Sequence, residues 1–144
     1  MNKLFAVLPA PPGYQLIEID DNAGDGNIDR WLSEPRIVLG FVVEQNETYF
    51  SVSPVTSFGV HDSHPNYALI RPDGKIEIPS GGLYGECTLE SLDHLKEHVL
   101  RFSAELDREM ADSMQKDGDR KQAAQCRRHA TKLDNEADVI MGLD

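Results

Sequence analysis

Residues 88–140, TLESLDHLKEHVLRFSAELDREMADSMQKDGDRKQAAQCRRHATKLDNEADVI, decide the fold class of this chain. Apolar residues recur in this stretch at steps of three and four, which is the spacing of one face of an α-helix. Asp117-Gly118-Asp119 interrupts the pattern, which predicts two helices joined by a turn. The first stripe comprises Leu92, Leu95, Val99, Phe102, Leu106, Met110 and Ser113, and the second comprises Ala123, Cys126, Ala130, Leu133, Ala137 and Ile140.

The two stripes are complementary in size. If the chain turns back at Gly118, Leu106 meets Ala130 and Met110 meets Cys126. A large residue then faces a small one in each layer, which allows close antiparallel packing. The alternative is one long helix that continues through Gly118 and uses the stripes for dimerisation.

The charges favour the same antiparallel pairing. The basic residues 127–128 fall near the acidic residues of the stretch 105–112. The acidic residues of the stretch 134–138 fall near Lys96 and Arg101. Because two independent patterns agree, we expect a helical hairpin rather than the single helix.

Residues 1–87 have the pattern of β-strands and turns. RIVLGFVV, at 36–43, is apolar on both faces and is placed at the centre of a sheet, with Gly40 at a bulge or a close backbone contact. In YALIRPDGKIEI, at 67–78, two β-runs flank Pro72-Asp73-Gly74, which predicts a tight hairpin. The chain is therefore expected to be α+β, with an antiparallel sheet of four to six strands followed by a long C-terminal antiparallel helical hairpin.

Length and composition agree with one such domain. The chain has 144 residues, so we expect a single domain over 1–144, with a β-rich part at 1–87 and the helical hairpin at 88–144. Thr88 is the expected N-cap of the first helix. No apolar run approaches the roughly 18 residues of a membrane span, and the N-terminal run is shorter than a signal-peptide core. Two cysteines indicate free thiols and a cytoplasmic location.

The net charge limits the kind of partner. The chain carries 14 basic and 25 acidic residues, a formal net charge of −11. Affinity for phosphate comes from Lys and Arg, so direct binding of nucleic acid is not expected. An acidic surface serves solubility, and it also steers association with basic proteins.

One acidic loop is the expected partner-binding site. Its carboxylates would attract a basic surface, and a tryptophan would supply the apolar anchor that a charged patch lacks. The alternative for the tryptophan is that the indole anchors the loop onto the core. The residues concerned are Asp20, Asp21, Asp25, Asp29 and Trp31.

HLKEH, at 94–98, matches the H-x-x-E-H signature of zinc proteases. His94 and His98 would share one helix face as ligands, and Glu97 would serve as the base. Such an enzyme needs a third ligand far downstream, and the remaining chain is short. We therefore expect no metal at His94 and His98.

A second group of histidines lies in a polar loop. His61 and His64, with Asp62 between them, offer metal-binding side chains. Loops between strands often collect such residues, so we expect no metal, no cofactor and no catalysis. The alternative is a small metal-dependent hydrolase that uses one of the two histidine pairs.

The stretch from Arg36 to about Val99 resembles small accessory proteins of phages and prophages. The resemblance lies in the apolar strand, the strand SVSPVT, the hairpin YALIRPDGKIEIP and the helix opening TLESLDHLKEHV. It covers less than half of the chain and identifies no functional residue. It implies a setting, because mobile-element genes of this size often encode inhibitors of host machinery, including anti-CRISPR proteins.

Three functions follow from these observations. The preferred one is a non-enzymatic acidic protein-binding module, phage-encoded, that blocks a basic nucleic-acid-handling complex in the host cytoplasm. The first alternative is the metal-dependent hydrolase. The second is a structural or assembly protein that oligomerises through its helices, of which a homodimer is one form.

Overall fold

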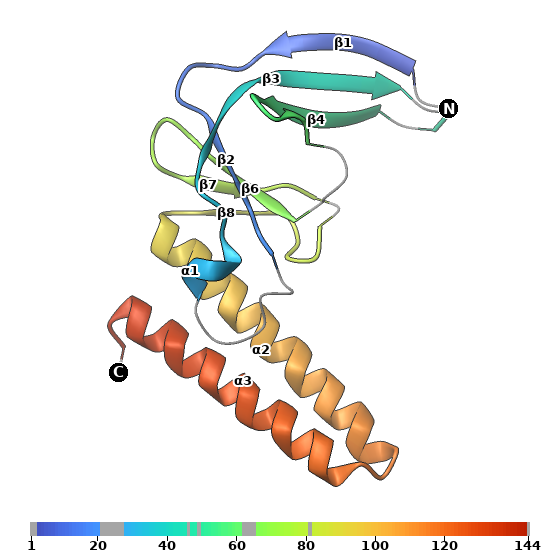
Figure 1. Ribbon diagram of the computed structural model, residues 1–144, viewed down its shortest axis with the longest axis vertical. Coiled ribbons are helices and arrows are strands. Elements are labelled where there is room, and N and C mark those ends of the chain that lie inside the picture. The colour runs from blue at the N-terminus through green and yellow to red at the C-terminus, as the bar shows by residue number, and fades with distance from the viewer. Residues whose placement is uncertain are drawn as a thin grey trace. The chain divides into compact units, whose positions relative to one another are not determined.

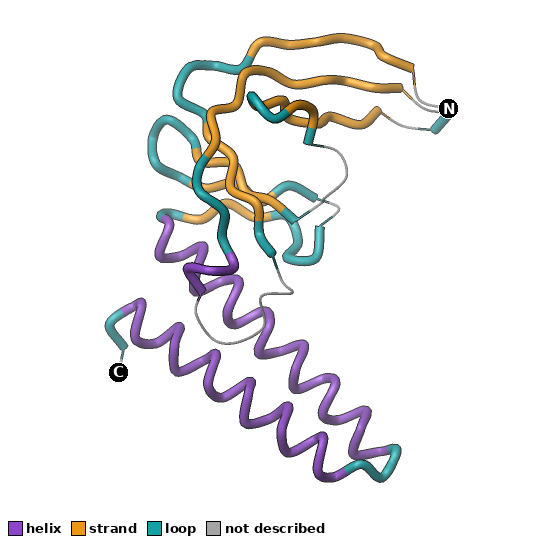
Figure 2. Tube along the Cα trace, viewed as in Figure 1, coloured by secondary structure: helices purple, strands orange, loops and turns teal. Residues whose placement is uncertain are grey.

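The computed structural model describes residues 3–20, 28–45, 47–48, 50–61, 66–80 and 82–143, with the backbone alone for 3–5. The chain divides into two compact units, one made of 1–22 and 29–88 and the other of 23–28 and 89–144. The strands are built from the first unit, except for the last residue of the last strand, and the two long helices from the second (Figure 2). The chain is therefore α+β, as predicted.

The first unit holds an antiparallel sheet with eight strands among the described residues, rather than four to six. Several strands are two to four residues long, too short to stand out as alternating patterns. Their order is β5-β4-β3-β2-β6-β7-β8, and β1 pairs with β3. The strands are β1 (Lys3–Pro9), β2 (Gln15–Glu18), β3 (Arg36–Gln45), β4 (Phe50–Thr56), β5 (Gly59–Val60), β6 (Tyr67–Ile70), β7 (Ile76–Ile78) and β8 (Cys87–Leu89).

β3 lies at the centre of the sheet, as its apolar sequence predicted (Figure 1). It pairs with β4 on one edge and with β1 and β2 on the other. A Cβ on Gly40 would lie 2.6 Å from the carbonyl oxygen of Leu8, well inside van der Waals contact. The register with β4 also shifts between Val38 and Gly40. Both features predicted for Gly40, a bulge and a close backbone contact, are thus confirmed.

The β6–β7 hairpin forms at Pro72-Asp73-Gly74, as predicted. The amide of Gly74 donates to the carbonyl of Arg71 at 3.0 Å, and the Asp73 carboxylate accepts from the amide of Lys75 at 3.0 Å. A side chain that binds the backbone two residues on is the usual contribution of Asp to a turn. This part of the sheet carries much of the buried apolar core, including Leu16, Ile17, Ala68, Ile76 and Ile78.

The second unit is a helical hairpin of α2 (Leu92–Lys116) and α3 (Arg120–Met141), which lie side by side and antiparallel in Figure 1. Between them Gly118 has a φ of +89°, a conformation that costs glycine little and other residues much more. The helical hairpin is therefore confirmed, and the alternative of one continuous helix is wrong.

Both helices begin at a side-chain cap. The hydroxyl of Ser91 accepts from the amide of His94 at 3.3 Å, and the Asp119 carboxylate accepts from the amide of Gln122 at 3.1 Å. Ser91 is thus the N-cap of α2, and the expectation of Thr88 is wrong because Thr88 belongs to β8. A single-turn helix, α1 (Ile28–Trp31), precedes β3. Within the described residues, no helix combines the length and apolar character of a membrane span.

Polar contacts cross the helical hairpin on both flanks of the helix contact, and they confirm the predicted charge pairing for Arg101 and Arg127. On one flank of α2, His129 from α3 hydrogen-bonds to Asp107. Exposed pairs of this kind contribute at most about 1 kcal/mol each, so they set the register more than the stability. The pairs on the other flank are Arg101–Asp134 (3.4 Å), Arg101–Asp138 (2.7 Å), Arg127–Asp112 (3.0 Å) and Arg108–Asp134.

Alanine dominates the contact between these two flanks. The α3 stripe is the contact face, as predicted, but α2 does not use the stripe that the sequence indicated. At about 100° per residue, the centre of that stripe lies roughly 150° around α2 from Ala104 and Ala111. Small residues on both helices allow a close approach of the two backbones. The fully buried alanines are Ala104, Ala111, Ala123, Ala130 and Ala137.

The contact expected between Met110 and Cys126 is consequently wrong. Met110 is 49% exposed, and Cys126 meets Met114 instead, with Sγ and Sδ 3.9 Å apart. Steps of three and four identify an apolar face, but they do not say which face of a helix meets its neighbour. Leu106, half-buried, lies on the same stripe as Met110 and outside the alanine contact.

Candidate functional site

The candidate site lies on β1, β3, β4 and β5, residues 3–9 and 36–60, which we name the first sheet segment. In an antiparallel ladder, residues directly opposite each other project from the same face. The register places Leu8, Phe41 and Pro54 in one row across the strands. The residues that share this face, which we name the apolar face, are Ala6, Leu8, Phe41, Val43, Phe50, Val52 and Pro54.

Part of the apolar face is open to solvent, whereas Pro54 on the same face is buried. Leu8, Phe50 and Val52 are 50%, 55% and 56% exposed. The solvent face of an antiparallel sheet normally carries polar residues, whereas the polar positions in the paired register of this face are Gln45 and, opposite it at the end of β1, Lys3. Among the described residues of the first unit, Leu83 is the only exposed large apolar side chain outside the first sheet segment. A concentration of this kind is typical of an interaction surface.

A shallow pocket of about 330 Å³ lies mainly on the opposite face of the first sheet segment, and Leu8 of the apolar face contributes to its lining. It carries no ionisable group, so it lacks the acids, bases and nucleophiles that catalysis needs. Its size and lining suit an apolar side chain of a partner. The lining residues are Val7, Leu8, Pro9, Leu39, Gly40 and Val55.

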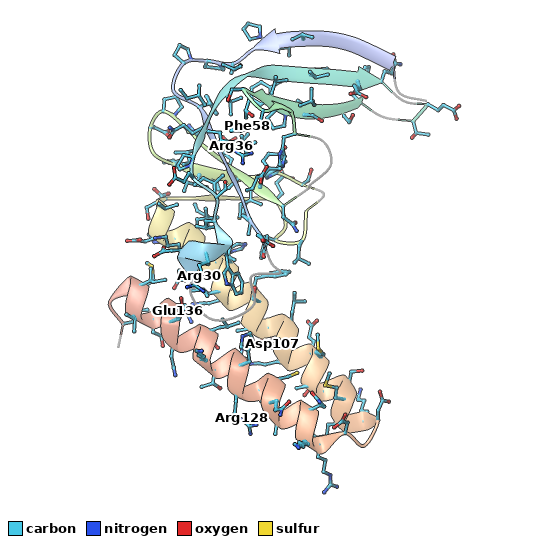
Figure 3. All side chains as sticks on the ribbon, in the orientation of Figure 1. Arg30, Arg36, Phe58, Asp107, Arg128 and Glu136 are labelled. Atoms are coloured by element: carbon cyan, nitrogen blue, oxygen red, sulfur yellow. The ribbon has the colours of Figure 1, made fainter. Side chains whose placement is uncertain are left out.

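The first sheet segment carries no net charge, because its two basic residues, Lys3 and Arg36, balance its two acidic ones, Glu44 and Glu47. The excess of −11 therefore lies entirely in the rest of the chain. The Arg36 side chain already interacts with Glu18 and Phe58. Its guanidinium lies 2.9 Å from Oε1 of Glu18 and 4.3 Å from the centre of the Phe58 ring (Figure 3). The segment is thus neutral overall, and its exposed surface combines apolar side chains with the exposed Glu47.

The histidines of HLKEH are not arranged as a zinc site. The hydroxyl of Ser91 and Nδ1 of His94 are 2.7 Å apart, and Arg101 donates to the Glu97 carboxylate at 3.1 Å. These contacts occupy one of the expected ligands and the expected base. Across the part of the chain that the structure describes, no group of three or more His, Cys, Asp or Glu side chains is placed to hold a metal ion.

We expect protein purified without chelator to contain well under one zinc ion per chain. Two imidazoles without a third ligand bind zinc too weakly to retain it through purification. Elemental analysis of the purified protein measures the metal content directly. Stoichiometric zinc that disappears in His98→Ala would contradict this prediction and restore the hydrolase alternative.

His61 belongs to a polar cluster inside the first unit. Its Nδ1 lies 3.3 Å from Oε1 of Glu18, and its ring meets the Tyr67 ring edge-on with 4.9 Å between centroids. Burial raises the pKa of Tyr67, so the phenol stays protonated at neutral pH. The Glu18 carboxylate is shared with Arg36, which favours a structural role for the cluster. His64 and Asp62 lie outside the described residues.

Asp20 and Asp29 are the described carboxylates of the acidic loop, and Asp21 and Asp25 lie outside the described residues. The amide of Asp20 donates to the carbonyl of Trp31 at 2.6 Å, which holds the two ends of the loop together. Trp31 is 3% exposed, so in this structure its indole anchors the chain in the interior. That is the alternative role that the sequence left open. A role of the loop in partner binding stays a prediction.

Cys87 does not have the surroundings of a catalytic thiol. Burial raises the pKa of its thiol, so the thiolate fraction at neutral pH is smaller than that of a free cysteine. The neighbouring pocket of about 440 Å³ contains two carboxylates, Glu77 and Glu86, and no imidazole. A carboxylate beside a thiol disfavours the thiolate further.

Comparison of the chain with family models, curated proteins and solved structures finds no match. The candidate site therefore depends on geometry alone. The sequence contained one signal for it, since alternation places Phe50 and Val52 on one face of their strand. The same alternation is typical of strands whose apolar face is buried, so the pattern alone does not reveal an open face.

Proposed function

We propose that the protein is a non-enzymatic protein-binding module whose contact surface is the apolar face of β1, β3 and β4. The observation that carries the proposal is the exposure of Leu8, Phe50 and Val52 on a face whose one charged position, Lys3, lies at the end of β1. Interfaces between proteins have an apolar, desolvated centre in which a few large side chains supply most of the binding energy. Phe50 has the size and the exposure of such a residue.

The partner in this proposal is a protein complex with a basic surface. The excess of acidic residues outside the first sheet segment attracts the basic partner over a long range and so speeds association. The apolar face then binds the partner. Complexes that handle nucleic acid are basic because they bind phosphates. The resemblance to phage and prophage proteins supports an inhibitor of such a host complex, of the anti-defence or anti-CRISPR type, acting in the host cytoplasm.

Capture from a bacterial lysate, with the tagged full chain as bait, tests the contact surface. We expect Val52→Asp to lower recovery of the partner at least about tenfold, because a buried carboxylate at an interface costs more than about 1.4 kcal/mol. Ser53→Asp is the matched control, since it places the same charge one residue away on the opposite face, opposite the uncharged Val42. Quantitative mass spectrometry compares the variants with wild type.

Equal recovery with wild type and Val52→Asp would contradict the apolar face as the contact surface. A wild-type bait that enriches no protein over an untagged control would contradict the proposal as a whole. The folding of both variants is checked by circular dichroism before capture.

The salt dependence of the same capture tests the electrostatic part. Recovery is expected to fall between about 0.15 M and 0.5 M salt, because attraction between exposed charges is screened beyond about 8 Å at physiological ionic strength. Replacing the four loop aspartates, Asp20, Asp21, Asp25 and Asp29, by asparagine is expected to weaken binding at low salt. Unchanged affinity at both salt concentrations would remove the loop from the interface.

A further inference from the structure

We infer that the open edge of β1 pairs with β1 of a second copy of this chain. β1 pairs with β3 along one edge, and none of the other described strands pairs with it. An unpaired edge leaves a row of backbone N–H and C=O groups available to another strand. The edge is distinct from the apolar face, so this inference does not depend on the proposed function.

The backbone N–H and C=O groups of Val7 face the open edge of β1. The amide of Ala10 donates to the carbonyl of Leu39 at 3.3 Å. Because direction alternates along a strand, the N–H groups of Leu8 and Ala6 also face β3. Val7 lies between these two residues, so its N–H and C=O face away from β3.

The middle of this edge lacks most of the features that prevent pairing. Proteins protect open edges with charged residues, prolines and bulges. In β1, lysine and proline stand only at the two ends, and the register shift with β3 falls between Leu4 and Ala6. From Ala6 to Leu8 the register is regular and uncharged, and the Val7 side chain is 64% exposed. These three residues therefore form a segment of open edge that can pair with another strand.

A two-fold axis at Val7 makes the pairing self-complementary. Val7 then lies opposite Val7 of the second copy, and each residue donates its N–H to the carbonyl of the other. Ala6 lies opposite Leu8 of the second copy, so a small side chain meets a large one. This register uses only the regular part of β1.

The charge distribution favours a second copy as the occupant. The first sheet segment has no net charge within a chain of net charge −11. Two copies therefore meet at this edge without bringing like charges together at the contact. A basic partner would find no carboxylate on β1, whose one charged residue is Lys3.

The dimer would join two sheets into one with the order β4-β3-β1-β1-β3-β4. Residues opposite each other in an antiparallel pair project from the same face. The apolar faces of both copies would therefore lie on one side of the joined sheet. A partner of the proposed module would meet a surface twice as wide.

Sedimentation of the full chain tests the dimer. We expect wild type to have a mass of about 32 kDa, twice the 16.1 kDa of one chain. Val7→Pro is expected to raise the dissociation constant at least about tenfold, because it removes the N–H that faces the open edge. That N–H does not bond to β3, so the sheet itself tolerates proline at this position. Val7→Thr keeps the amide and the branched shape, and this control is expected to remain a dimer.

Disulfide formation tests the register independently. In a background of Cys87→Ser and Cys126→Ser, Ala6→Cys combined with Leu8→Cys is expected to give a covalent dimer on mild oxidation. The two positions lie opposite each other across the axis in a pair without mutual hydrogen bonds, about 4.5 Å apart at Cα, which suits a disulfide. Leu8→Cys alone has no cysteine opposite it and is expected to stay uncrosslinked.

A monomeric wild-type chain, or a Val7→Pro variant that dimerises with the dissociation constant of wild type, would overturn the inference. Equally fast crosslinking of Leu8→Cys alone would overturn the register. Sedimentation reports self-association and lysate capture reports a second protein, so failure of the dimer and failure of the proposed function give different results.

Discussion

Ala104→Leu is expected to lower the free energy of unfolding by about 3 kcal/mol, because it overpacks the alanine contact of the helical hairpin. Ala104 is fully buried, and the buried residues on the α3 side of the contact are Leu133 and the small residues Ala123, Ala130 and Ala137. Three additional heavy atoms at this point force the two helices apart or force strained rotamers. Thermal denaturation followed by helical circular dichroism measures the loss, about 2–4 °C for each kcal/mol in a chain of roughly this size.

Met110→Leu is the matched control on the same helix. Met110 is 49% exposed, and leucine has a similar volume and helix propensity, so a change below about 0.5 kcal/mol is expected. If the stripe predicted from the sequence were the contact face, Ala104 would lie outside the contact and Ala104→Leu would change the stability little. A stable Ala104→Leu would therefore show that α3 does not pack on the alanine face.

Gly40→Val is expected to cost about 3 kcal/mol and to release β1 from β3. The new Cβ would lie 2.6 Å from the carbonyl oxygen of Leu8. That oxygen belongs to the backbone, so it cannot rotate away as a flexible side chain would. Overpacking of a close contact costs about 1–3 kcal/mol, and the lost strand pairing adds to it. Hydrogen exchange of the β1 amides is expected to accelerate strongly.

Ser53→Val serves as the control for Gly40→Val. Ser53, on β4, lies opposite Val42 of β3, close to Gly40 in the sheet. Its side chain is half-buried. Valine has a high β-propensity and fits a half-buried strand position, so stability is expected to stay near that of wild type. Wild-type protection of the β1 amides in Gly40→Val would show that β1 does not approach β3 this closely. The dimer through β1 would then lose its structural basis.

Short-range patterns predicted the parts of the fold that depend on neighbours in sequence. Hydrogen bonds within the five residues 71–75 close the Pro72-Asp73-Gly74 turn. The positive φ of Gly118 ends α2. The α3 stripe was also correct, since its alanines face α2 as expected. Propensity and spacing act locally, so these features could be predicted before any tertiary contact was known.

Features that depend on contacts between segments far apart in the sequence were harder to predict. Four to six strands were expected and the described residues form eight, because a strand of two or three residues is defined by its partner rather than by its own sequence. Trp31 had two interpretations, and its burial at 3% exposure favours the interior one. Its position depends on how the chain folds back at both ends of the acidic loop.

The α+β class, the two C-terminal helices, the turns between elements and the central place of β3 could all be inferred from local patterns of residues. The tertiary structure alone decided that α2 meets α3 through Ala104 and Ala111, and that Leu8, Phe50 and Val52 remain exposed. The physical reason is that periodicity shows which residues share a face, whereas burial depends on what covers that face. A covered strand and an open one follow the same alternation, and only the arrangement of the other strands distinguishes them.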